Sequence, residues 1–201
     1  MQEIEFLYDF SSPNAYFVHK VLPKIAARHG AKVIWRPVLL GGIFKATNNQ
    51  PPMMAFSNVT GKVDYMRLEI KRFLERYEMP FRMNPHFPVN SLALMRGAVF
   101  AREKPWESRY IDACFDAMWI AGEKMDDPDV IMRILAAADL PADVIMTATQ
   151  TPDIKGQLAE LTDAAVKSGA FGSPTMFVAG EMFFGKDALD DLNWRLETLS
   201  A

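Results

Sequence analysis

The chain has 201 residues, of which 50% are hydrophobic and 23% are charged, with a formal net charge of -3. This length is sufficient for one large globular domain that buries its own core. The small negative charge and the lack of long basic runs argue against binding to nucleic acid, and no apolar run reaches the length of a membrane span.

The only cysteine, Cys114, cannot form a disulfide within the chain. No basic segment followed by an apolar run precedes the first predicted strand, so we expect a cytoplasmic protein. Cys114 lies on an apolar helical stripe and is predicted to be a core residue. The three histidines have no Cys, Asp or second His at ligand spacing, so no metal site is predicted.

The first predicted strand leads directly into the first predicted helix. Residues 4–8 alternate and are rich in aromatic and branched side chains, which is typical of a strand. Ser12-Pro13 then favours a helix start, with serine at the N-cap and proline at the first helical position. The helical pattern ends at His29-Gly30, and residues 32–39 alternate again. Together these segments predict a parallel βαβ unit.

The pattern changes at Gly41. Gly41-Gly42 and then residues 48–52 predict a loop that is neither helix nor central strand. About a hundred residues of helical periodicity follow, and their apolar stripes can be buried only against one another or against the sheet. The stripes lie within residues 66–77, 92–100, 110–121 and 130–135.

The last part of the chain returns to an α/β pattern. Pro152 opens a further helix that ends near Gly169. Residues 173–185 contain two short apolar runs around a tight turn, which predicts a β-hairpin. Leucines from Leu189 onward lie at helical spacing and predict a final helix.

This order of elements resembles the α/β thioredoxin-like fold of the bacterial disulfide oxidoreductases. The implied core (βαβ, then α, β-hairpin, α) comprises residues 1–45 and 150–201, and the implied all-helical insertion subdomain comprises residues 46–149. In those proteins the first helix starts with Cys-x-x-Cys, but this chain has Ser12-Pro13-Asn14-Ala15 at the matching positions. Disulfide exchange needs a thiolate, so the usual redox role is excluded.

Six short motifs occur in order over nearly the whole chain. They are Tyr8-Asp9-Phe10-Ser11-Ser12-Pro13, Leu40-Gly41-Gly42-Ile43-Phe44-Lys45 with Asn49-Gln50-Pro51-Pro52, Lys62-x-x-Tyr65, Phe87-Pro88-x-Asn90-Ser91, Gly169-Ala170-Phe171-Gly172-Ser173-Pro174 and Phe184-Gly185-Lys186-Asp187. This set is similar to the 2-hydroxychromene-2-carboxylate isomerases and the kappa-class glutathione transferases.

The resemblance implies glutathione as the cofactor, with its thiol against Ser12 as the catalytic residue. A hydroxyl that donates to the thiolate, together with the helix N-terminus, lowers a thiol pKa. Lys186 stands where the family often has Asn or Ser, and it either contacts a carboxylate or changes the affinity for glutathione. The implied cofactor-binding residues are Ser12, Asn49, Lys62, Ser173, Pro174, Lys186 and Asp187, with a cis peptide between Ser173 and Pro174.

Most of these residues also have a purely structural interpretation. Ser12 can serve only as an N-cap, and Pro174 can simply start a strand. Lys62 can be a solvated lysine and Asn49 a turn former. The residues expected to line the substrate pocket are Ser11, Met53, Tyr65 and Asn90.

The resemblance implies a glutathione-dependent isomerase that converts 2-hydroxychromene-2-carboxylate into trans-o-hydroxybenzylidenepyruvate during aromatic hydrocarbon catabolism. The implied chemistry is reversible addition of the cofactor thiolate. Two alternatives remain: a kappa-class transferase or peroxidase that acts on diverse electrophiles, and a non-catalytic glutathione-binding protein. The expected partners are glutathione, a small aromatic acid and a second copy of the chain in a homodimer.

Overall fold

The fold is organised around a mixed four-stranded sheet with strand order β2-β1-β3-β4 in a computed structural model that describes residues 1–200. The strands are β1 (Glu3–Tyr8), β2 (Lys32–Pro37), β3 (Thr175–Val178) and β4 (Glu181–Phe184). β1 and β2 are parallel, whereas β3 is antiparallel to both β1 and β4. Phe6 of β1 therefore pairs with Trp35 on one side and Met176 on the other, which places the two ends of the chain side by side.

The first helix, α1 (Pro13–Arg28), joins β1 to β2 as predicted. Ser12 is its N-cap with an extended backbone, and Pro13 occupies the first helical position. His29 ends the helix, and its backbone N–H donates to the carbonyl of Ala26 at 3.1 Å. The local sequence signals therefore suffice to define this element.

The segment after β2 differs from the prediction. Residues expected to be irregular from Gly41 onward form a helix, α2 (Leu40–Thr47), which packs against α9 (Pro152–Lys167). Gly42 permits this close approach, because a Cβ atom there would lie 3.1 Å from Cγ2 of Thr162. Packing thus outweighs the low helix propensity of the two glycines, and the loop prediction is wrong for residues 41–47.

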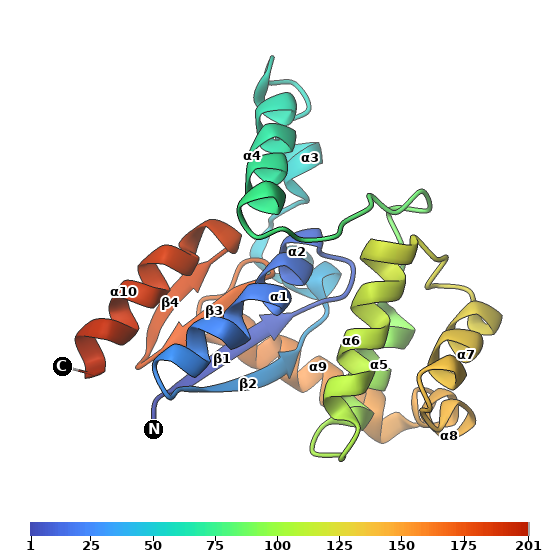
Figure 1. Cartoon of the computed structure of the whole chain (residues 1–201). Coiled ribbons are helices and arrows are strands. Elements are labelled where there is room, and N and C mark those ends of the chain that lie inside the picture. Colours follow the sequence, from blue (N-terminus) through green and yellow to red (C-terminus); the bar gives the residue numbers. More distant parts are fainter. Residues whose placement is uncertain (201) are drawn as a thin grey trace.

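Helices fill the interval between α2 and α9 (Figure 1). They are α3 (Pro52–Ala55), α4 (Lys62–Arg76), α5 (Leu92–Ala101), α6 (Glu107–Asp116), the π-helical turn η1 (Ala117–Ala121), α7 (Pro128–Ala137) and α8 (Ala142–Ala148). The four predicted stripes fall on α4, on α5, on α6 with η1, and on α7, whereas α8 corresponds to none of them. α3 and α4 project from the body of the molecule, and α5 to α8 gather beside the sheet.

The predicted hairpin is present and is followed by a short 3-10 turn, η2 (Lys186–Ala188), and the final helix α10 (Leu189–Ser200). Ala179 and Gly180 both have positive φ, as the mirror-image turns of tight hairpins require. α1 and α10 contact each other, while α2 and α9 form a separate buried cluster with Leu7 and Val38. No helix within residues 1–200 has both the length and the apolar character needed to cross a membrane.

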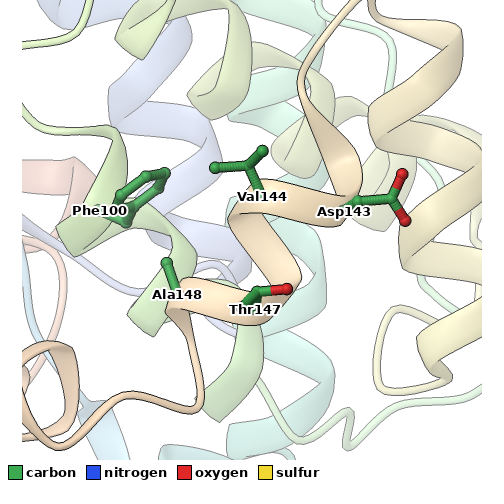
Figure 2. A pocket seen from close by; sticks show the side chains of 5 residues that line it. All are labelled: Phe100, Asp143, Val144, Thr147 and Ala148. Atoms are coloured by element: carbon green, nitrogen blue, oxygen red, sulfur yellow. The ribbon is translucent and has the colours of Figure 1, made fainter.

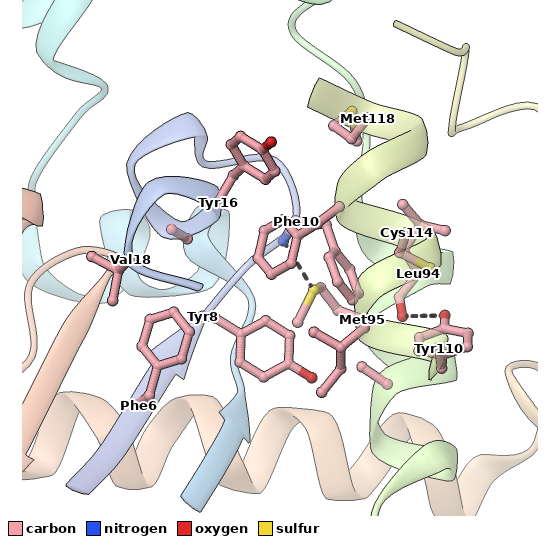
Figure 3. Packing of buried hydrophobic residues seen from close by; sticks show 14 of the residues in the cluster. Phe6, Tyr8, Phe10, Tyr16, Val18, Leu94, Met95, Tyr110, Cys114 and Met118 are labelled. Carbon is pink, nitrogen blue, oxygen red and sulfur yellow. Dashed lines mark hydrogen bonds between the residues drawn. The ribbon is translucent and has the colours of Figure 1, made fainter. Parts of the chain in front are cut away.

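The core runs without interruption from the sheet into the helical insertion (Figure 3). Phe10, just after β1, packs its ring 4.8 Å from that of Phe115 in α6. Its backbone N–H lies 3.4 Å from Sδ of Met95, and its carbonyl accepts the Nε1–H of Trp119 at 2.8 Å. The chain segment that leads to Ser12 is therefore held on both sides by the insertion.

Candidate functional site

Ser12 lies at the positive end of a 16-residue helix, α1. Its side chain is 5% exposed. The Oγ atom accepts the backbone N–H of Ala15 at 3.2 Å and donates to the carbonyl of Ser173 at 2.9 Å. No acidic residue lies in the first turn of α1, so no side chain there opposes an anion near this helix end.

Ser173 brings the second half of the site from the end of the chain. The Ser173–Pro174 peptide bond is cis, which confirms the prediction for this position. The carbonyl of Pro174 accepts the N–H of Gly185 at 3.0 Å, so the segment is tied to the end of β4. Within residues 1–200, the backbone N–H of Ser173 has no hydrogen-bond acceptor.

Asn14 supplies two further polar groups beside Ser12. Its Oδ1 atom is buried and has no hydrogen-bond partner. Its backbone N–H, in the first turn of α1, also lacks an acceptor among the described residues. A buried acceptor without a partner is costly unless a ligand satisfies it. Together with the Ser173 N–H, these groups are chemically suited to a ligand that carries both donors and acceptors.

Asp9 is a buried acidic residue next to the site, and the sequence analysis assigned no role to it. It lies three residues before Ser12 and is completely buried. Its Oδ1 accepts both the N–H and the hydroxyl of Ser11, at 2.8 and 2.9 Å, and its Oδ2 accepts the N–H of Leu40 at 2.7 Å. Burial raises the pKa of this carboxyl, while these hydrogen bonds and one from Ser91 act to lower it. The available signal was an acidic residue between Tyr8 and Phe10, where an apolar side chain would be usual.

Asn49 lies close to the Ser173 segment. Its Nδ2 donates to the carbonyl of Phe171 at 2.8 Å, and its Oδ1 accepts the N–H of Gln50 at 2.8 Å. Asn49 therefore links the end of α2 to the residues that precede Ser173. Both of its side-chain polar atoms have partners within the chain.

Lys186 and Asp187 pair with each other in η2, at the start of α10. Lys186 is 5% exposed, and its Nζ lies 5.4 Å from the ring centroid of Phe73 in α4. The Asp187 side chain is 73% exposed. The ammonium group thus offsets the charge of Asp187 and holds α4 against the core.

Three other predicted residues, Lys62, Met53 and Tyr65, belong to α3 and α4. Nζ of Lys62 lies over the rings of Phe56 and Tyr65, at 5.5 and 5.7 Å from their centroids. Lys62 begins α4 at the outer end of the α3–α4 projection, and Met53 and Tyr65 are exposed on the same projection (Figure 1). Asn90 accepts the N–H of Leu92 at 3.0 Å and so caps the start of α5.

A cavity of about 390 Å³ lies between α5 and α8, lined by Phe100, Asp143, Val144, Thr147 and Ala148 (Figure 2). None of the predicted site residues lines it. Within residues 1–200, no three His, Cys, Asp or Glu side chains are placed to hold a metal ion.

Known proteins match this chain over almost its full length. The profile of the DSBA-like thioredoxin domain matches residues 3–197. A 2-hydroxychromene-2-carboxylate isomerase from Sphingobium xenophagum is 27% identical over 94% of this chain and 95% of its own. The glutathione S-transferase kappa 1 of Rattus norvegicus is 28% identical over 96% of this chain and 90% of its own.

A solved 2-hydroxychromene-2-carboxylate isomerase superposes with a TM-score of 0.86 at 24% identity, covering 98% of this chain and 95% of the other. That likeness establishes the α/β thioredoxin-like fold with a helical insertion.

Proposed function

The chain belongs to the DSBA-like thioredoxin domain family, and we propose that it is a glutathione-dependent isomerase acting on 2-hydroxychromene-2-carboxylate or a closely similar aromatic acid. The proposed product is trans-o-hydroxybenzylidenepyruvate. The enzyme class rests on isomerases and transferases that match this chain over at least 90% of their own length, and the substrate is the finer part of the proposal.

One observation carries the proposal. Ser12 places a hydroxyl, not a thiol, at the N-terminus of α1 and directly opposite the cis Ser173–Pro174 peptide. The only thiol of the chain, Cys114, is fully buried in the core. A site with this geometry and no sulfur of its own suits a thiol that arrives with a cofactor.

Glutathione, when bound, supplies the nucleophilic thiolate. The residues of this chain bind and orient it. The Ser12 hydroxyl, whose proton lies toward the Ser173 carbonyl, rotates about its Cβ–Oγ bond to donate to the sulfur. The α1 N-terminus and the free N–H of Asn14 add positive potential at the same place. The N–H of Ser173 is left to pair with the cofactor backbone.

Stabilising the thiolate increases the fraction of reactive cofactor. A helix N-terminus stabilises an anion by about 0.3–1 kcal/mol, and a charge-assisted hydrogen bond by about 1.5–3 kcal/mol. One pKa unit corresponds to about 1.4 kcal/mol. The two effects together therefore suffice to bring a thiol with a pKa of roughly 8.5 to neutrality.

The second candidate is a kappa-class transferase or peroxidase that acts on diverse electrophiles. It is favoured by the kappa relatives, which are as similar to the chain as the isomerases are. Both candidates use the same thiol site and differ in the second substrate.

The test compares three reactions with and without glutathione. Purified protein is assayed for isomerisation of 2-hydroxychromene-2-carboxylate, conjugation of a generic electrophile and reduction of a peroxide. We expect glutathione-dependent isomerisation to be the fastest. Faster conjugation or peroxide reduction would favour the second candidate, and absence of glutathione binding in calorimetry would exclude both.

The proposal includes a homodimer. Large apolar side chains are exposed on the α3–α4 projection, where a second copy could cover them. They are Met53, Met54, Phe56, Val59, Tyr65 and Leu68. Sedimentation velocity measures the mass in solution, and a monomer at all accessible concentrations would contradict this part.

A further inference from the structure

Three helices begin around the carboxylate of Asp9. α1 starts just after Ser12, α2 starts at Leu40, and α5 starts at Leu92. Each helix N-terminus carries unpaired N–H groups and a partial positive charge. A buried carboxylate between these helix starts therefore interacts favourably with their partial positive charges.

Asp9 caps one of these three helix starts directly and interacts with the N-cap residue of a second. Leu39, the N-cap residue of α2, makes no capping bond through its side chain, and Oδ2 of Asp9 takes the N–H of Leu40 at 2.7 Å instead. Ser91, the N-cap residue of α5, makes no side-chain bond to its own helix, and its side chain acts to lower the pKa of the Asp9 carboxyl. The N–H of Leu92 at this helix start bonds to Oδ1 of Asn90 at 3.0 Å. At the α1 start, Oγ of Ser12 takes the N–H of Ala15, and the N–H of Asn14 has no acceptor among the described residues.

Asp9 also shapes the loop that carries Ser12. Its backbone carbonyl accepts the N–H of Ser12 at 3.0 Å, while its Oδ1 accepts both donors of Ser11. The intervening residue, Phe10, is held by Met95 and Trp119. Residues 10, 11 and 12 are thus each bonded to Asp9 or to the helical insertion.

From this arrangement we infer that Asp9 is the positioning residue of the thiol site. It directs the Ser12 hydroxyl and the α1 N-terminus toward the cofactor sulfur without touching that sulfur. The inference rests on the proposed function in so far as the sulfur belongs to glutathione. The position of Ser12 itself can be measured without any cofactor.

The decisive variant is Asp9→Asn, which has nearly the same volume but only one acceptor oxygen. Its NH₂ group must face either the N–H of Leu40 or the donors of Ser11. The matched control is Asn84→Ala. Asn84 is also buried, and its side chain bonds to the carbonyls of Met118 and Glu123 and to the N–H of His86, which all lie in the insertion.

Two readouts distinguish positioning from general stability. The first is amide hydrogen exchange at Ser12 and Ala15, whose N–H groups bond to Asp9 and to Ser12 Oγ. We expect Asp9→Asn to accelerate exchange at these two amides by more than its loss of global stability explains. Asn84→Ala should accelerate their exchange only by the amount that its own loss of global stability explains. The second readout is the thiol pKa of bound glutathione, which we expect to rise by about one unit in Asp9→Asn. The fall in kcat near neutral pH should then exceed the change in KM by about tenfold.

The outcomes separate the two proposals. If wild-type protein binds no glutathione but Asp9→Asn still loosens Ser12 and Ala15, the proposed function fails and the positioning role stands. If Asp9→Asn and Asn84→Ala lose equal stability while exchange and thiol pKa match wild type, the positioning role is overturned. Should Asp9→Asn not fold, Ser91→Ala removes a single donor to Asp9 and is expected to shift both readouts in the same direction by a smaller amount.

Discussion

The hydroxyl of Ser12 donates to the carbonyl of Ser173 across 161 residues of sequence, at 2.9 Å. A serine hydroxyl has one proton, so this bond and a bond to a thiolate exclude each other. A neutral hydrogen bond contributes about 1 kcal/mol, and one to a charged group contributes about 1.5–3 kcal/mol. The exchange therefore favours the thiolate once it is present.

Replacing Ser12 by alanine is expected to raise the pKa of bound glutathione by about one unit. Turnover near neutral pH should then fall about tenfold, because less thiolate is present. The pKa is measured by titrating the ultraviolet absorbance of the thiolate in the complex. The control is Thr151→Ala, which removes the N-cap hydroxyl of α9, another 16-residue helix. Both variants should lose about 1 kcal/mol of stability, and only Ser12→Ala should change the thiol.

Two glycine-to-alanine substitutions in helices should change stability in opposite directions. At Gly41 in α2 an added Cβ would meet no atom within 4 Å beyond the backbone of its own helix, so alanine should stabilise by about 0.5–1 kcal/mol. At Gly97 in α5 a Cβ would lie 2.1 Å from the Tyr110 hydroxyl, which donates to the carbonyl of Leu94. Gly97→Ala should therefore destabilise by about 1–3 kcal/mol. Urea unfolding measures the free energy of unfolding of both variants. A change in the same direction in both would contradict this packing.

His19 is expected to make the protein less stable in mild acid. Its ring is buried between Trp35 and Phe115, with Nε2 at 2.8 Å from Oδ1 of Asp112 and no partner for the buried Nδ1. Burial lowers the pKa of His19 despite the hydrogen bond to Asp112. The unfolded chain then binds this proton more readily, so the free energy of unfolding falls as the pH drops below about 6.5 and toward the folded-state pKa.

Urea unfolding at about pH 7.5 and pH 5.5 tests this effect of His19. His19→Leu should show a smaller difference between the two pH values than wild type. His86→Gln removes an exposed histidine and should behave as wild type. Identical pH dependence in wild type and His19→Leu would contradict the prediction.

Cys114 should resist alkylation in the native protein. Its side chain is fully buried, and burial raises the pKa of its thiol to about 12. Iodoacetamide needs an accessible thiolate, which an ordinary cysteine with a pKa of roughly 8.5 supplies at mildly alkaline pH. Mass spectrometry should find native protein unmodified and denatured protein fully modified. Native modification at the rate of a free cysteine would show that the core around Cys114 opens.

The affinity for glutathione distinguishes two opposite roles of Lys186, which either offsets the charge of Asp187 or contacts the cofactor itself. Lys186→Met keeps an apolar stem near Phe73 and removes the charge that offsets Asp187. If Asp187 attracts the ammonium group of glutathione, the affinity measured by calorimetry should rise several-fold. A fall in affinity would instead mean that Lys186 itself contacts a cofactor carboxylate. Lys124→Met, which breaks the pair with Asp126 in the insertion, is the control.

The sequence predicts the elements whose signals are local. The start of α1 at Ser12-Pro13, the start of α9 at Pro152 and the β3–β4 hairpin follow from capping and turn residues within a few positions. α2 could not be predicted in this way, because it packs against α9 through Gly42, whose neighbour Thr162 lies more than a hundred residues away in the sequence. α8 lacks a capping side chain and has only seven residues, too few to show a clear periodicity.

The candidate site likewise contains some residues with a local sequence signal and others without one. Ser12 and Ser173 could be singled out from their prolines and from the resemblance to known families. For Asp9 the sequence offers only an acidic residue between two aromatic ones, because its contacts with Leu40 and Ser91 form only in the folded chain. The Nε1–H bond from Trp119 to the carbonyl of Phe10 spans 109 residues and leaves no local trace. Long-range bonds of this kind set the geometry and are invisible to periodicity.

The two halves of the site come from opposite ends of the chain, and exposed residues 103–105 lie in a turn of the insertion between them. A cut in this turn would leave Ser12 on one fragment and Ser173 on the other. Neither fragment could then carry out thiol chemistry alone, and any recovered turnover on mixing would report reassociation of the two pieces. On the proposed function, the protein is thus suited to fragment complementation, with glutathione-dependent turnover as the signal.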